Sequence, residues 1–185
     1  CITEFWNYFD KNQYAFELLQ ELLPEDKAEK LNELSRLIEV FHPRIGYVFN
    51  LNKNGFEFII TGYGNPYLFK SVELLVKYAP QLGKWKISAF IPPSKDIDQY
   101  KNGTDQPFNY RGISLRISEM KYNIINTENN PLLISLNIYI KNFVVLGYND
   151  HLVTAIYTLL EHLLGEKSFA NEIHLIKICQ LTGTI

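Results

Sequence analysis

A strict alternation of apolar and polar residues over residues 132–141 constrains the fold of this chain more than any other feature. Every second position from Leu132 to Ile140 is leucine or isoleucine, and polar residues or tyrosine separate them after Leu133. A period of two places the apolar side chains on one face of a β-strand. Residues 113–118 alternate in the same way, so we predict that the two segments form an antiparallel hairpin that turns at "NTENNP".

The preceding part of the chain follows a similar order. Residues 45–62 contain two short apolar runs separated by Asn54 and Gly55, which is a strong signal for a two-residue hairpin turn. A helix is predicted to begin at Asn65, as N-cap before a proline, and to end at Pro80. These signals predict two antiparallel strands followed by a helix.

Each of these helices is predicted to lead into one more strand. In "KWKISAFI", residues 84–91, the alternation places Trp85 on the apolar face of the predicted strand and Lys86 on its polar face. The second helix is capped near Asn149 or Asp150 and is followed by a strand in "EIHLIKICQL". Both halves therefore have the order hairpin, helix, strand.

A duplication of one plan is consistent with this order, because Gly-Tyr precedes each helix, at Gly62 and at Gly147. Two further amphipathic helices are predicted at the amino terminus, the first with Thr3 as N-cap and the second beginning at Pro24. The predicted fold is α+β, with one mostly antiparallel sheet of about six strands and helices packed on one face.

We expect a single domain, because 185 residues with 46% hydrophobic content are enough for one core. Its predicted parts are a helical segment at residues 1–42, a first half at 43–92, a loop at 93–109 and a second half at 110–185. The loop is the best candidate for a boundary between the halves.

Charge and composition exclude several classes of function. The net charge is −2 and the basic residues are scattered, so nucleic acid is not an expected partner. No apolar run approaches the roughly 20 residues of a membrane-spanning helix. The only two cysteines, Cys1 and Cys179, have no C-x-x-C spacing, which favours a cytoplasmic protein. A mature lipoprotein also begins with cysteine, but "ITEFWNYF" starts a helix at once, which favours numbering that begins inside a longer gene product.

No motif in the sequence predicts a catalytic residue, a cofactor or a metal site. Gly62 and Gly64 lack the third glycine and the parallel context of a dinucleotide fingerprint, so we interpret them as a turn. The four histidines lack metal-ligand spacing, and there is no G-x-S-x-G nucleophile motif. The absence of such motifs favours a non-enzymatic protein and leaves an enzyme as the alternative.

The leading hypothesis is a non-enzymatic protein-binding or accessory domain of unknown oligomeric state. Its predicted partner surface is the polar face of the sheet, namely Lys84, Lys86, Arg116, Asn137, Tyr139 and Lys141. The alternative is an enzyme or small-ligand binder with its site between this polar face and the loop at 92–109. Its polar contributors would be Asp96, Asp98, Tyr100 and Arg111.

Two stretches of the chain resemble a group of uncharacterised bacterial proteins. The first is "FWNYFDKN", residues 5–12, with the pattern F-W-x-x-F-x-x-N. The second matches a conserved block of that group at Phe69, Val72, Glu73, Leu75, Val76, Ala79, Pro80, Leu82, Gly83, Trp85, Ala89, Phe90 and Pro92. The resemblance covers the first half of the chain. It implies a bacterial origin and an α+β domain, and it carries over no catalytic residue.

Overall fold

Antiparallel hairpins extended by parallel strands form the two larger sheets of this protein. The computed structural model describes residues 1–52, 55–126 and 133–182. The predicted α+β class is confirmed. The strands do not form the single sheet that was expected, because the described strands divide among three sheets, β1-β2-β3, β4-β5 and β6-β7-β8.

The chain divides into two compact units, Cys1–Ile91 and Pro92–Ile185. The boundary lies at the start of the segment that the sequence suggested, and the single-domain organisation stays a prediction. Residues 93–109 are not the loop that was expected, because they contain the helix α4, Ile97–Asn102, and the start of β4, Phe108–Tyr110.

The sheet of the first unit contains the predicted hairpin. β1, Gly46–Asn52, pairs antiparallel with β2, Gly55–Thr61, while Asn54 lies outside the described residues. β3, Trp85–Ala89, pairs with β2 in parallel. A parallel neighbour needs a crossover connection, which α3, Phe69–Lys77, provides.

The entry to α3 is capped as expected. The Asn65 side chain accepts a hydrogen bond of 3.1 Å from the backbone N–H of Tyr67, at the start of the 3₁₀ turn η1, Pro66–Leu68. The helix ends at Lys77 rather than at Pro80. Proline bars the helical conformation in the residue before it, so the helix ends a few residues earlier than a Pro stop suggests.

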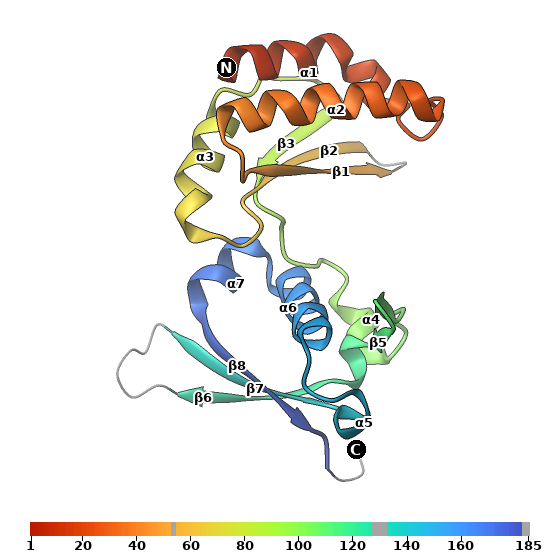
Figure 1. Ribbon diagram of the computed structural model, residues 1–185, viewed down its shortest axis with the longest axis vertical. Coiled ribbons are helices and arrows are strands. Elements are labelled where there is room, and N and C mark those ends of the chain that lie inside the picture. The colour runs from red at the N-terminus through yellow and green to blue at the C-terminus, as the bar shows by residue number, and fades with distance from the viewer. Residues whose placement is uncertain (53–54, 127–132, 183–185) are drawn as a thin grey trace. The chain divides into compact units, whose positions relative to one another are not determined.

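Two amino-terminal helices cover one face of this sheet, α1, Ile2–Glu17, and α2, Pro24–Phe41 (Figure 1). Phe9 stacks on Phe58 of β2 with ring centroids 4.4 Å apart and meets the Trp85 ring edge-on at 5.1 Å. The N-cap of α1 is Cys1 rather than Thr3, and no side chain caps the helix.

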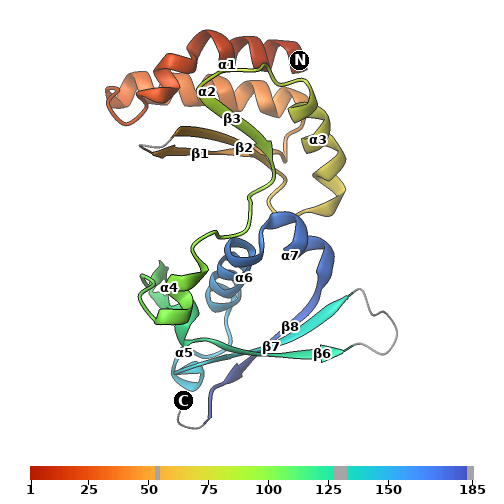
Figure 2. The same ribbon diagram turned by 180° about the vertical axis from the view of Figure 1, so that it is seen from behind.

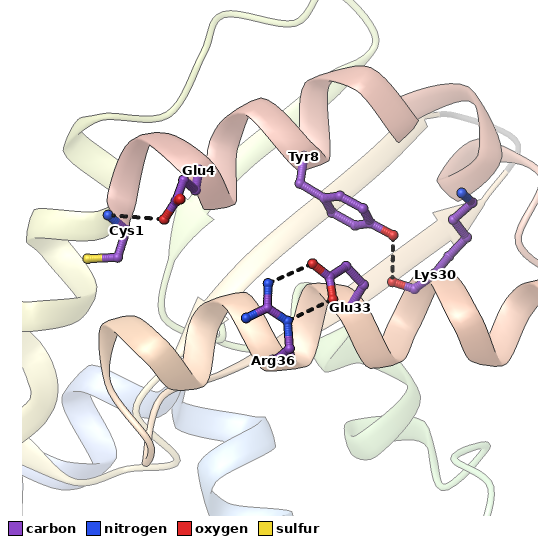
Figure 3. A network of polar contacts seen from close by, with 6 residues as sticks. All are labelled: Cys1, Glu4, Tyr8, Lys30, Glu33 and Arg36. Atoms are coloured by element: carbon purple, nitrogen blue, oxygen red, sulfur yellow. Dashed lines mark hydrogen bonds and ion pairs between the residues drawn. The ribbon is translucent and has the colours of Figure 1, made fainter.

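Polar contacts link and flank α1 and α2 (Figure 3). The Tyr8 hydroxyl donates a hydrogen bond of 3.3 Å to the carbonyl oxygen of Lys30, which joins the two helices. Burial, reinforced by Glu33 and Glu29, raises the pKa of Tyr8. Within α2, Arg36 donates two hydrogen bonds of 2.8 Å to the Glu33 carboxylate, and this exposed pair lies on the surface of the helix.

The second unit contains a small sheet and a larger one. β4 pairs with β5, Ile113–Leu115, and a 3₁₀ turn, η2, Ile117–Glu119, follows. In the larger sheet, β7, Ile134–Ile140, lies between β6, Lys121–Asn126, and β8, Ile173–Gln180. Besides α4, the described helices of this unit are α5, Phe143–Leu146, α6, Asp150–Leu164, and α7, Glu166–Glu172.

The predicted partner of β7 was wrong. Residues 113–118 were expected to pair with it, but strand β5 ends at Leu115, a 3₁₀ turn begins at Ile117, and β6 pairs with β7 instead. The prediction that Ile113 and Leu115 face a core was correct, since both are buried, but they belong to the smaller sheet. Most of the predicted turn "NTENNP" lies outside the described residues.

Helix α6 packs across one face of the larger sheet (Figure 2). Its buried residues are Leu152, Ala155, Ile156, Leu159 and Leu160. The Asn149 side chain caps the helix by accepting a hydrogen bond of 3.0 Å from the Leu152 N–H, which confirms the predicted cap. β8 pairs with β7 in parallel, so each unit has the predicted order of hairpin, helix and strand. The duplication itself stays a prediction.

Candidate ligand-binding site

A cavity of about 380 Å³ opens in the second unit between the α4–β4 segment and helix α6. Its apolar walls come from Pro107, Phe108, Ile117 and Leu159. Its polar lining consists of Gln99, Tyr100, Asp105, Gln106, Thr158 and His162. Although more polar than apolar residues contribute, most of the exposed surface of the cavity is apolar, as is typical of pockets that bind small organic molecules.

The segment from α4 to β4 folds so that its residues face this cavity. Helix α4 ends at Gly103, whose φ of 70° is left-handed and favours glycine, and Thr104 N–H bonds back to the Gln99 carbonyl. The chain then turns toward β4. The Tyr100 hydroxyl lies 3.1 Å from the Ser94 hydroxyl, which fixes the tyrosine ring at the wall of the cavity.

The opposite wall comes from one face of α6. Thr158 and His162 are four positions apart, so they lie on the same side of the helix. The Thr158 hydroxyl donates its proton to the Thr154 carbonyl oxygen at 2.8 Å. Because that proton is committed, the lone pairs of the Thr158 oxygen are left to accept a hydrogen bond from a ligand.

Asp105 is the most unusual residue of the lining, because a charged side chain is only 3% exposed. Its Oδ2 accepts a single backbone hydrogen bond, from the Ser118 N–H at 3.3 Å. Its Oδ1 is buried and has no hydrogen-bond partner among the residues that the structure describes. Buried polar atoms are almost always paired, so this oxygen calls for a donor.

The charge of the lining has one sign. Neither lysine nor arginine occurs among the described residues that line the cavity, and His162 at its rim is the one side chain there that can become a cation. Asp105 also forms no ion pair within the described part of the chain. The cavity can therefore accept hydrogen bonds from a ligand and offers little to bind an anion.

Of the four polar residues expected at such a site, the structure brings one to the cavity, Tyr100. Asp96 is exposed beside α4, and Asp98 lies 3.8 Å from Lys101 on the surface of that helix. Arg111 lies in the turn between β4 and β5, with its guanidinium 5.8 Å from the centre of the Tyr110 ring. The site was expected between the 92–109 segment and the polar sheet face, whereas the cavity lies between this segment and α6, and a ligand site here stays a prediction.

The sequence did not indicate that Asp105, Thr158 and His162 line a common cavity. Asp105 lies in "GTDQP", whose composition is typical of exposed turns, and nothing local indicates that its carboxylate is buried. The spacing of Thr158 and His162 places them on one face of α6, but this face lines a cavity only because the α4–β4 segment lies opposite it. Spatial assembly of this kind cannot be obtained from spacing alone.

The six residues of the predicted partner surface divide between different sheets and turns. Lys84 precedes β3 and pairs with Glu17 at 3.1 Å, and Lys86 in β3 pairs with Glu57 at 2.9 Å. The other four belong to the second unit. Asn137 and Tyr139 lie on one face of β7, while Arg116 and Lys141 directly follow β5 and β7. Their expected common sheet is wrong, and their role in binding a partner stays a prediction.

No protein-family model, curated protein or solved structure matches this chain. The described helices include none that is both long and apolar enough to cross a membrane. Within the same residues, no three histidine, cysteine, aspartate or glutamate side chains gather where they could hold a metal ion. The geometry of the cavity therefore carries the functional argument.

Proposed function

We propose that this protein binds a small organic molecule in the cavity between α4 and α6. The observation that carries the proposal is Asp105 Oδ1, a buried carboxylate oxygen without a hydrogen-bond partner among the described residues. Leaving such an atom unpaired costs about 1–3 kcal/mol of stability, and a ligand that donates to it recovers that cost. The volume of about 380 Å³ falls in the usual range for ligand pockets, roughly 300–1,000 Å³.

A thermal-shift screen of the whole chain against a set of metabolites tests the proposal. A ligand at 100 times its dissociation constant stabilises the folded state by about 2.7 kcal/mol, which such a screen detects easily. We expect at least one compound with an apolar body and a donor group to raise the melting temperature. A screen in which no compound does so counts against the proposal.

A matched pair of variants locates the binding. Thr158→Phe places a ring at the wall of the cavity, whereas Thr154→Phe places the same ring one turn earlier on α6, outside the lining. Both threonines are exposed and both hydroxyls bond to a carbonyl four residues back, so the two changes have similar structural costs. The ligand shift should disappear in Thr158→Phe and persist in Thr154→Phe. Persistence in both variants would place the ligand elsewhere.

The protein-binding role expected from the sequence is a second candidate. It is favoured by the face of the larger sheet that carries Ser135 and Asn137, because both have a buried oxygen without a partner in the described residues. Leu175, beside Ser135 on that face, is 56% exposed. Affinity capture with the wild type and with Leu175→Glu tests this role. A partner that the wild type retains and the variant loses supports it, whereas recovery of none above background argues against it.

A further inference from the structure

We propose that the ligand of the Asp105 cavity is an organic ammonium, a protonated amine on an apolar body, whose N–H donates to Asp105 Oδ1. This inference rests on the proposed function and adds the charge and the donor group of the ligand. Three features of the cavity lead to it: the uncompensated charge, the carboxylate oxygen without a described partner and the apolar walls.

The first feature is the charge of Asp105. Its carboxylate is almost fully buried and accepts one long hydrogen bond of 3.3 Å from a neutral backbone N–H. A neutral donor, such as an alcohol, would satisfy Oδ1 but leave the negative charge without a counterion. A cation provides both the hydrogen bond and the opposite charge, and charge-assisted hydrogen bonds are the stronger kind.

The second feature selects among cations. A divalent metal ion needs several oxygen or nitrogen ligands, and the described residues gather no set of three such acidic, histidine or cysteine side chains. A guanidinium binds a carboxylate through two parallel hydrogen bonds to both oxygens. Oδ2 already accepts from Ser118 N–H, whereas Oδ1 has no described partner, so the two oxygens are not equivalent acceptors. An ammonium is a compact point charge that can satisfy Oδ1 alone, and it therefore matches this asymmetry better than a bidentate guanidinium.

The third feature concerns the rest of the ligand. An ammonium has three N–H donors, and the Thr158 oxygen together with the side-chain carbonyls of Gln99 and Gln106 offers further acceptors in the lining. The walls formed by Phe108, Ile117 and Leu159 suit a hydrocarbon or aromatic body. The ligand class is therefore an alkyl or aryl amine.

Calorimetric titration of the whole chain at pH 7 with two probes of the same shape tests the inference. The probes are 2-phenylethylamine, which is protonated at this pH, and the neutral 2-phenylethanol. We expect the amine to bind at least tenfold more tightly than the alcohol. This ratio is measured on the wild type, so it does not depend on the folding of any variant.

Variants then assign the effect to Asp105. Asp105→Asn should reduce the affinity for the amine at least tenfold and leave the affinity for the alcohol nearly unchanged, whereas Asp98→Asn, an exposed aspartate of α4, should alter neither. Circular dichroism shows whether each variant folds. If Asp105→Asn folds and keeps the full preference for the amine, the inference is overturned.

The two proposals fail in different ways. Equal binding of amine and alcohol, abolished for both by Thr158→Phe, would overturn the ammonium inference and leave the ligand-binding function intact. Amine binding that survives Thr158→Phe would also overturn it, because the amine would then bind outside the cavity. If neither probe binds and no compound of the metabolite screen does, both proposals are wrong.

Discussion

The indole N–H of Trp6 donates a hydrogen bond of 2.8 Å to the carbonyl oxygen of Leu75, 69 positions along the chain. This bond ties α1 to the last turn of α3, and the same carbonyl oxygen also accepts a backbone hydrogen bond of 3.2 Å from the Tyr78 N–H. Trp85 is almost as deeply buried, yet its Nε1 has no hydrogen-bond partner in the described residues. The two tryptophans of the first unit thus differ in one bond.

We expect Trp6→Phe to destabilise the protein by about 1 kcal/mol more than Trp85→Phe. Both changes remove a similar volume from the core, but only the first removes a buried hydrogen bond. Urea unfolding of the two variants measures the difference. Equal losses, or a larger loss for Trp85→Phe, would mean that the bond to Leu75 contributes nothing to the free energy of unfolding.

Trp85→Ala should cost roughly 3–5 kcal/mol, because it leaves a cavity among the rings of Phe9, Phe49 and Phe58. Lys86→Ala, on the opposite face of β3, should change stability by less than about 0.5 kcal/mol, since the Lys86–Glu57 ion pair lies at the surface. Denaturant melts of both variants measure the two effects. A parent-like melt for Trp85→Ala together with a large loss for Lys86→Ala would reverse the assignment of the two faces.

The stability of the second unit should depend on pH through Glu161. Burial, with a smaller contribution from Glu166, raises the pKa of the Glu161 carboxyl above its ordinary value of 4.5. The folded state therefore holds this proton more tightly than the unfolded state, and stability falls as pH rises from 4.5 through the raised value. Glu161→Gln removes the penalty, so we expect a higher melting temperature than the wild type at pH 7.

The advantage of Glu161→Gln should shrink as the pH falls toward 4.5, where the wild-type carboxyl becomes neutral as well. Melting curves at several pH values measure this convergence. Glu172→Gln, at an exposed position on α7, is the control and should change stability by less than about 0.5 kcal/mol at any of these pH values. A gain for Glu161→Gln that stays constant with pH would contradict the proposed cause.

Asn149→Ala should destabilise the protein by about 1 kcal/mol, because α6 loses the acceptor for the Leu152 N–H. Asn149→Asp keeps an acceptor at the same position and places a negative charge at the helix amino terminus, so it should retain most of the stability. Thermal melts compare the two. Loss of the same size in both variants would show that the donors of the Asn149 amide, rather than its acceptor, hold the turn before α6.

Signals within a few neighbouring residues predicted much of this fold. The hairpin of β1 and β2, the caps at Asn65 and Asn149 and the inward face of Trp85 follow from turn residues, capping residues and alternation. Each of these features depends on the chemistry of its own segment. Local preference and final structure agree there.

The choice of strand partner could not be predicted in this way. Residues 113–115 and β6 were both candidates to pair with β7. Residues 113–115 alternate more regularly, yet they pair with β4, and β6 pairs with β7. Tyr122 and Ile124 of β6 are 70% and 50% exposed, so the strand that does pair lacks the pattern expected of a half-buried one. Asp105 illustrates the same limit at the candidate site, because its burial depends on segments far away in the sequence.

The parallel strand that completes each larger sheet bears on the order of folding during synthesis. A hairpin such as β1–β2 closes as soon as its own residues are present, whereas β3 reaches β2 only after the segment that forms α3 has been made. A nascent chain that ends before Trp85 therefore carries β2 with one edge unpaired, next to Phe58 and Ile60, which the complete protein buries. Exposed strand edges beside apolar residues recruit other chains, so a chain that ends before Trp85 should aggregate more readily than the complete protein.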